Sequence, residues 1–343
     1  MATIGPAYHM YDASTAAEQI DRLISCDLQA RTFFPALYAA ARAVQDGPLC
    51  LLAANRLREA LEDTQAPTIL FVTGFFSPIL GVGEQDGPVG TTYLARVLEQ
   101  AFGAVPLVVT DGDQIDLVTQ TLRGGGFNVI PPDRAIAAAR HGKGKAASVL
   151  AFPHEPKAAA REAERLLVEI RPRALVAIER PGANAAGIPH SLGAMEIGDI
   201  TAPTDELLRV VRNAGCPSIA IGDAGNELGC GKIHAEIARI LGEERRCPTC
   251  QESIAAFESA DVLVMAAVSN WGAYGVAAAL ALILDAPRIL PDIRVLEWTL
   301  RACGLAGGRN GMSDWTDPGS DGLPLRVDLG VLAMLRALVG AHG

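Results

Sequence analysis

The sequence predicts an α/β protein: a three-layer α/β/α sandwich with a mainly parallel sheet and helical additions at both ends. From residue 67 onward, short apolar runs rich in Val and Ile alternate with stretches in which apolar residues recur every three or four positions. The runs are continuously apolar, as in parallel strands that are covered on both faces. Half of the 343 residues are apolar, which is ample for a large core.

The elements follow in order along the chain. Residues 1–63 predict a helical segment packed on the main domain, because "TAAEQIDRLISCDL" and "LCLLAANRLREALED" show helical apolar spacing. Residues 64–343 form the predicted α/β domain, and its last part, 292–343, is helical around one long loop. Strands are predicted at 68–74, 106–111, 148–153, 174–179, 218–223 and 261–269, with a short additional strand at 127–132. Helices are predicted between them at 89–102, 114–122, 155–170, 204–214, 232–242 and 272–285.

Composition excludes several classes of partner. The net charge of −10 disfavours nucleic acid, because an acidic surface repels phosphate, and it provides no basic membrane patch. The longest apolar stretch, residues 275–284, is too short to cross a bilayer. The first residues lack a basic start and an apolar segment, so we expect no signal peptide. Seven cysteines, an odd number, are typical of a reducing cytoplasm. A homo-oligomer is left open.

Polar side chains gather where the predicted strands end. In an open parallel sheet, ligands bind beyond the carboxyl ends of the strands. Carboxylates crowded there repel one another unless a cation or an ammonium group lies among them. The side chains in question are Glu84, Asp86, Asp111, Glu179, Arg180, Asn184, Asp223, Asn226, Glu227, Ser269 and Asn270.

The segment "SIAIGDAGNELGCG" shows this pattern most densely. Asp223 ends an apolar run, and Gly225, Gly229 and Gly231 allow positive φ or close approach of a ligand. Asp223 and Asn226 are also good turn formers, so a plain strand-to-helix turn is the alternative.

Hard cations prefer carboxylate oxygens, so the acids predict a Mg²⁺ or Mn²⁺ site with Asp86, Glu179, Asp223 and Glu227 as ligands. No HExxH motif is present, and the histidines are dispersed. A lone CxxC motif is formed by Cys247 and Cys250. It could be half a zinc site with Cys230 and His234, or a redox pair. We expect the pair to be reduced and metal-free, without contact to Cys230, because no second pair stands at zinc spacing.

Five blocks occur in a characteristic order: "EQDGPVGTTYLARVLE", "VVTDGDQ", "LVAIERPGAN", "SIAIGDAGNELGCGK" and "VSNWGAYGVAAALA". Together they resemble the D-glutamate cyclase-like domain family, which includes the C-terminal part of mitochondrial D-glutamate cyclase and stand-alone prokaryotic members. The resemblance covers roughly residues 45–330. It implies an α/β/α sandwich, an acidic divalent-metal site and closure of D-glutamate to 5-oxo-D-proline with loss of water. A metal-dependent phosphatase activity is the alternative within the family.

The chemistry assigns roles to these residues. Asp223, Glu179 and Glu227 supply metal ligands or a base, and Arg180 is expected to clamp a substrate carboxylate. The expected partner is therefore a small anionic substrate. Hydrolysis of small phosphate monoesters would use similar groups, and a binding module without turnover is a third possibility. The expected substrate-binding residues are Asn184, Asn226, Ser269 and Asn270.

Overall fold

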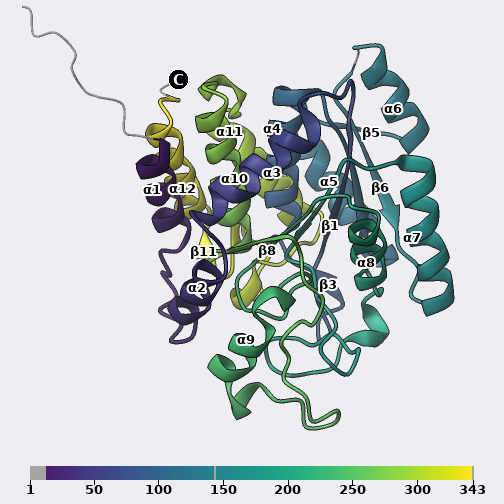
Figure 1. The fold of residues 1–343 in the computed structure, drawn as a ribbon, viewed down its shortest axis with the longest axis vertical. Helices are drawn as coiled ribbons and strands as arrows, with labels where there is room; N and C mark the ends of the chain where they lie inside the picture. Colours follow the sequence, from purple (N-terminus) through teal and green to yellow (C-terminus); the bar gives the residue numbers. More distant parts are fainter. Residues whose placement is uncertain (1–12, 143, 342–343) are drawn as a thin grey trace, which may run out of the picture.

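Seven strands form the central sheet, in the order β5-β6-β4-β1-β7-β8-β9, and every neighbouring pair is parallel (Figure 1). The computed structural model describes residues 13–142 and 144–341, so the first twelve residues of the predicted helical segment lie outside it. The strands are β1 (Thr68–Thr73), β4 (Val105–Thr110), β5 (Asn128–Val129), β6 (Ala146–Ala151), β7 (Ala174–Ile178), β8 (Ser218–Gly222) and β9 (Val262–Met265). The predicted parallel sheet is confirmed, including the short strand near residue 128.

Two antiparallel hairpins lie outside the sheet. The first joins β2 (Phe76–Ser77) to β3 (Val82–Gly83), directly after β1. The second joins β10 (Gly319–Ser320) to β11 (Leu323–Pro324), near the end of the chain. Neither hairpin was predicted, because strands of two residues are too short to show a hydrophobic period. The strand β5 is equally short, but it lies in the apolar run 127–132.

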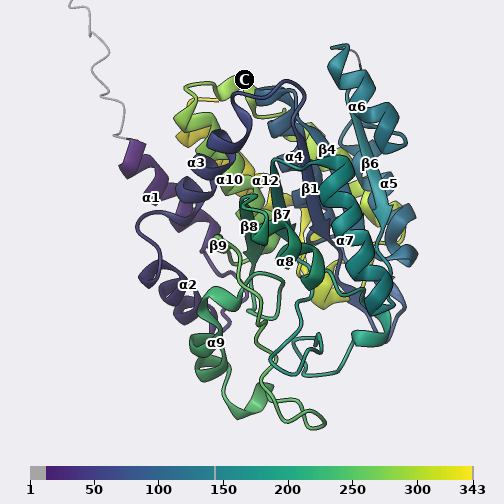
Figure 2. The same ribbon diagram turned by 45° about the vertical axis from the view of Figure 1, so that its right-hand side comes forward.

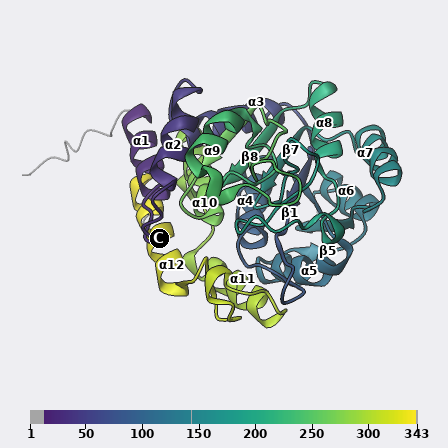
Figure 3. The ribbon, with the colours of Figure 1, turned by 90° about the horizontal axis from the view of Figure 1, so that it is seen from below.

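Helices cover both faces of the sheet, which gives the predicted sandwich. On β1, Ile69 and Phe71 face a core shared with α3, α4 and α10, whereas Leu70 and Val72 face a core shared with α6, α7 and α8. Figures 2 and 3 show α6, α7 and α8 together on one side of the strands. The alternation follows from the strand geometry, in which successive side chains point to opposite faces.

Twelve α-helices lie within the described residues, and none of these helices has the length and apolarity needed to cross a membrane. The helix α6 was missed, because the residues before it were interpreted as a strand running to residue 132. Residue 132 is a proline, and it is the first residue of the helix, a position where its fixed φ is favourable. The helices are α1 (Ala13–Ile24), α2 (Phe34–Ala43), α3 (Leu49–Leu61), α4 (Pro88–Phe102), α5 (Ile115–Gly124), α6 (Pro132–Arg140), α7 (Pro156–Ile170), α8 (Asp205–Asn213), α9 (His234–Leu241), α10 (Ser269–Ile283), α11 (Ile293–Leu305) and α12 (Leu325–Leu338).

The N-terminal helices pack on the main domain. The helices α1 and α3 lie against α10, and α1 also contacts α12 (Figure 1). The loop between α1 and α2 reaches the carboxyl end of β8, where Arg31 contacts Asp223. The predicted boundary at residues 63 and 64 stays a prediction, but side chains from before it take part in the site described next.

Candidate active site

A cavity of about 720 Å³ opens at the carboxyl edge of the sheet. This volume lies within the range of small-molecule sites. Its charged lining consists of four carboxyl groups and three arginines, and aromatic side chains form part of the wall. The lining includes Arg31, Phe33, Phe75, Phe76, Glu84, Glu179, Asp223, Asn226, Arg245, Arg309 and Asp321.

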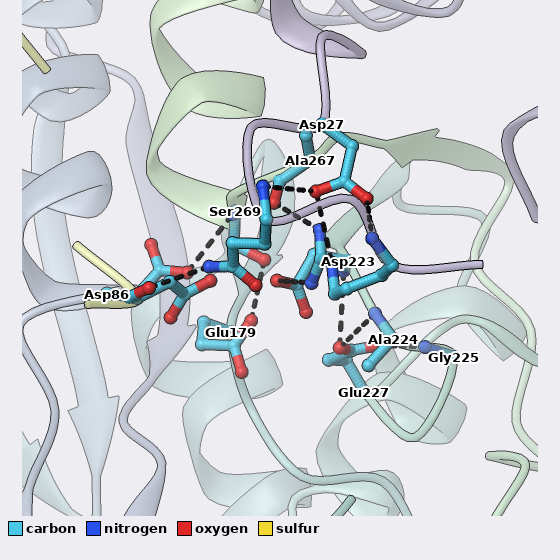
Figure 4. Close-up of polar contacts among 12 residues, drawn as sticks. Asp27, Asp86, Glu179, Asp223, Ala224, Gly225, Glu227, Ala267 and Ser269 are labelled. Atoms are coloured by element: carbon cyan, nitrogen blue, oxygen red, sulfur yellow. Dashed lines mark hydrogen bonds and ion pairs between the residues drawn. The ribbon is translucent and has the colours of Figure 1, made fainter. Parts of the chain in front are cut away.

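Three carboxylates meet beside this cavity: Asp86, Glu179 and Asp223. One oxygen from each lies within 4.8 Å of the others, and all three side chains are buried. They come from three neighbouring strands, since Asp86 follows β1 through the first hairpin, Glu179 follows β7 and Asp223 follows β8. Figure 4 shows the three residues approaching from different elements. The structure therefore brings together three of the four predicted metal ligands.

Asp86 is held by the start of α10. Its Oδ1 accepts hydrogen bonds from the backbone N–H groups of Gly87 and Asn270, at 3.1 and 2.7 Å, and its Oδ2 accepts one from Ser269 at 3.1 Å. In return, the Asn270 Oδ1 accepts from the N–H groups of Gly87 and Gly90 at the start of α4. Each helix start is thus capped by a side chain from the other segment. This is why α10 begins at Ser269, within the segment predicted as strand.

Glu179 occupies a strained backbone position. Its φ is +44°, in the left-handed region that non-glycine residues rarely adopt. The Ser269 hydroxyl donates to its Oε2 at 2.6 Å (Figure 4). This hydrogen bond holds the carboxylate at the strand end, where it faces the other two acids. Ser269 and Asn270, predicted to bind substrate, instead position Glu179 and Asp86.

Glu227 organises the loop that carries Asp223. Its carboxylate accepts the N–H groups of Asp223, Ala224 and Gly225 at 3.2, 2.8 and 2.7 Å (Figure 4). Gly225 has a φ of +95°, and a Cβ there would collide with Ile237. The polar residues and the glycine after β8 therefore build a tight loop around a buried acid. The three-carboxylate group does not include Glu227, which we reassign from ligand to loop anchor.

Two arginines that were not predicted reach the carboxyl groups of the cavity. Arg31 contacts Asp223 Oδ2 at 2.9 Å and is itself held by Asp27. Arg309 forms an ion pair with Glu84 and contacts Asp314 at 2.7 Å. Both arginines lie in loops that do not directly follow a strand of the sheet in the sequence, so the strand-end pattern gave no signal for them.

Burial raises the pKa of several of these carboxyl groups. It raises the pKa of Asp86 and Glu179 well above their ordinary values, and the charge of Asp223 adds to both effects. Burial also raises the pKa of Glu84 to about 7, although Arg309 opposes the shift. These acids therefore favour a positively charged ligand in the cavity. A donor set made only of carboxylate oxygens suits a hard cation such as Mg²⁺ or Mn²⁺.

Arg180, the predicted carboxylate clamp, lies elsewhere. It is fully buried, and its guanidinium pairs with Asp111, with Nη2 at 2.9 Å from Oδ1. It also donates to the carbonyl groups of Gly74 and Ala202, at 3.2 and 2.8 Å. Arg180 does not line the cavity, whereas Arg31 and Arg309 do. We replace Arg180 by Arg31 and Arg309 as the candidates for binding a substrate anion.

The other two side-chain amides predicted to bind substrate, those of Asn226 and Asn184, lie in different places. Asn226 lines the cavity, donates to the carbonyl of His190 at 2.9 Å, and has a buried Oδ1 without a hydrogen-bond partner. Asn184 turns away, toward Cys250 and the carbonyl of Ser253. Asn226 therefore remains a candidate for substrate binding, whereas Asn184 belongs to a second cluster.

Comparison with known proteins gives a consistent result. Residues 40–336 match the family described as "D-glutamate cyclase-like, C-terminal". The human protein "D-glutamate cyclase, mitochondrial" is 38% identical over 107 residues, which cover 31% of this chain and 16% of the human one. The three clustered carboxylates lie within the family match, and Arg31 lies before it.

Proposed function

The chain belongs to the D-glutamate cyclase-like C-terminal family, and from this membership we propose that it is a metal-dependent enzyme that closes D-glutamate to 5-oxo-D-proline and water. A related small anionic substrate is the broader form of the proposal. The observation that carries it is the group formed by Asp86, Glu179 and Asp223, which lies beside a cavity that also contains arginines. The three acids are the proposed ligands of Mg²⁺ or Mn²⁺.

The charges of the cavity match those of an acidic amino acid. D-Glutamate has two carboxylates and one ammonium group, so it needs cationic and anionic partners in one site. Arg31 and Arg309 supply guanidinium groups, which bind carboxylates through two parallel hydrogen bonds. Glu84 and Asp321 supply acidic groups on the same wall, which suit the ammonium. The unpartnered oxygen of Asn226 is a further acceptor for it.

Ring closure needs proton transfer as well as orientation. The amine nitrogen forms a bond to the carbon of the side-chain carboxylate, and one carbon–oxygen bond breaks. The ammonium loses two protons in all, and the departing oxygen takes two and leaves as water. A divalent cation on Asp86, Glu179 and Asp223 would supply the Lewis acidity that makes the carboxyl carbon electrophilic.

Glu84 is the proposed proton carrier. With a pKa of about 7, it is present in both its acid and its base form near neutral pH, as general acid–base catalysis requires. Its position on the cavity wall, among the residues proposed to bind the substrate, supports this role.

The same parts suit a phosphate monoester, because arginines and a cation also stabilise phosphoryl oxygens. Hydrolysis of small phosphate monoesters is therefore the second candidate. A phosphate monoester that lacks an amine would bring more negative charge to a cavity that has four carboxyl groups and three arginines, which favours the amino acid. A non-catalytic module that binds the same ligand is the third candidate.

A metal-titrated screen of the purified chain separates these candidates. The chain is stripped with a chelator, reloaded with Mg²⁺ or Mn²⁺, and incubated with D-glutamate, L-glutamate and a panel of phosphate monoesters. We expect 5-oxo-D-proline, detected by chiral chromatography, only with metal and with the D enantiomer. Release of phosphate without 5-oxo-D-proline would replace the proposal by the phosphatase. Metal-dependent binding without product would replace it by the binding module.

A further inference from the structure

A second cluster of metal-binding side chains lies outside the three-carboxylate group. It consists of His190, Glu196, Cys247 and Cys250, and one ligand atom from each lies within 4.8 Å of the others. The histidine and glutamate belong to the loop after β7, and the cysteines to the loop before β9. In contrast to the carboxylate group, this set combines two sulfurs, one nitrogen and one oxygen.

The CxxC turn presents both sulfurs on one side. The N–H of Cys250 donates to the Cys247 Sγ at 3.4 Å, and the Asn184 amide donates to the Cys250 Sγ at 3.5 Å. The N–H of Gln251 bonds to the carbonyl of Cys247 at 3.0 Å and closes the turn. Both sulfurs thus receive N–H donors and lie on one side of the turn, as the two ligands of a metal-binding CxxC motif do.

The histidine is oriented by its other nitrogen. His190 is fully buried, and its Nδ1 lies 2.8 Å from the carbonyl oxygen of Ile188. A carbonyl only accepts hydrogen bonds, so Nδ1 carries the proton, and Nε2 of the neutral ring keeps its lone pair. Nε2 lies 3.7 Å from the Cys250 Sγ. Fixing the tautomer through a backbone carbonyl is the usual support of a metal-binding histidine.

The glutamate completes the set. Glu196 lies opposite His190 in an antiparallel bridge, and its Oε1 is 3.3 Å from the Cys247 Sγ. Ligand atoms about 2.0–2.3 Å from a tetrahedral zinc ion lie about 3.3–3.8 Å from one another. The contacts at 3.3 and 3.7 Å therefore match two edges of such a tetrahedron.

We propose that Cys247, Cys250, His190 and Glu196 bind one Zn²⁺ ion. Sulfur and imidazole ligands in this number select zinc over Mg²⁺ or Mn²⁺. The partners considered from the sequence, Cys230 and His234, are occupied elsewhere, by Glu227 and by the carbonyl of Ala256. The expected metal-free pair is thus revised, because the missing ligands come from a distant segment rather than from a second CxxC.

The ion would join two loops that form one wall of the cavity. Ser191, Leu192 and Gly193 directly follow the histidine ligand and line the cavity, as does Arg245 beside the CxxC turn. The carbonyl of His190 also accepts from Asn226. The role assigned to zinc is therefore structural, with four protein ligands.

Metal analysis of the full chain tests the proposal. We expect ~1 zinc per chain by mass spectrometry after purification with zinc present, and a fall to below ~0.1 in the Cys247→Ser, Cys250→Ser double variant. Replacing two other thiols, Cys26 and Cys216, by serine is the matched control and should leave the zinc content unchanged. Cobalt loading should give sulfur-to-cobalt charge-transfer absorption in the wild type and not in the double variant.

Other results would overturn the proposal. They are wild-type chain without zinc, zinc that persists in the double variant, or a Cys247–Cys250 disulfide as the stable form under mild reduction. Should the double variant not fold, a mercurial reagent added to wild-type chain must release the zinc as it titrates the thiols, and failure to do so counts against the site. The Asp223→Asn variant should keep its zinc, so this test is independent of the proposed activity.

Discussion

The two candidate ion sites differ in their donors and in their origin. The carboxylate group takes one oxygen from each of the segments that follow three neighbouring strands, and its members are buried. The proposed zinc site takes its ligands from two loops, and two of these ligands, His190 and Cys250, are 60 residues apart in the sequence. The first site lies where a parallel sheet always places its ligands. The second depends on how two irregular loops pack, for which no general rule exists.

The largest expected effect concerns Arg180, which was predicted to bind substrate and is buried outside the cavity. Replacing Arg180 by Met leaves Asp111 buried without its partner, so we expect the free energy of unfolding to fall by about 3–5 kcal/mol. Urea denaturation measures the loss, and the additional change Asp111→Leu should recover part of it. If the chain instead keeps its stability and only its KM rises, Arg180 is the substrate clamp after all.

Asp223→Asn tests the carboxylate site itself. The amide keeps the size and the turn but removes the charge, so we expect turnover to fall by about 100-fold or more, or about 2.7 kcal/mol of transition-state stabilisation. The steady-state rate of 5-oxo-D-proline formation at saturating Mn²⁺ measures this loss. The matched control is Asp133→Asn on the exposed side of α6, which should have no effect. Unchanged turnover in Asp223→Asn would reduce this residue to a turn former.

The strands and the acids that follow them could be predicted from the sequence, but the direction of each side chain could not. The alternation of apolar runs with helical stretches predicted all seven strands of the sheet. The acids that follow those strands predicted the group formed by Asp86, Glu179 and Asp223. Glu227 stands in the same pattern, but its carboxylate turns back onto the N–H groups of its own loop. Sequence spacing fixes which residues follow a strand, and it does not fix where their side chains point.

The remaining site residues depend on contacts that are distant in sequence. Arg31 reaches Asp223 across 192 positions, and Arg309 reaches Glu84 across 225. The partners of the CxxC motif are hidden for the same reason. Such pairs become visible only when the loops are placed in space.

Asp328, a buried acid outside both sites, is expected to make a smaller, pH-dependent contribution to the free energy of unfolding. Asp328 accepts from the Trp271 indole at 3.1 Å and from Ser320 at 3.0 Å, and burial raises its pKa from 3.8 to about 7. The folded chain therefore binds more protons than the unfolded chain between these values, so stability should fall as the pH rises through them.

Asp328→Asn removes this titration while keeping the acceptor oxygen. Between pH 5 and pH 8, we expect the free energy of unfolding to fall in both proteins. The fall in the variant should be smaller than the fall in the wild type by on the order of 1–2 kcal/mol. Thermal or urea unfolding at a series of pH values gives the slope. Asp133→Asn should reproduce the wild-type slope, and an identical slope in Asp328→Asn would show that Asp328 is ionised throughout.

The smallest effect is expected from removing the proposed zinc site. The Cys247→Ser, Cys250→Ser double variant leaves Asp86, Glu179 and Asp223 in place. The start of α10 holds Asp86 and Glu179, and Glu227 anchors the loop of Asp223. It loosens only the wall that carries Ser191 to Gly193 and Arg245. We therefore expect KM to rise by a few-fold, less than about 1.4 kcal/mol, while kcat stays within about twofold. Initial rates over a range of D-glutamate concentrations separate the two constants. A fall in kcat as large as that of Asp223→Asn would mean that the two ion sites act as one, and that the division between chemistry and structure drawn here is wrong.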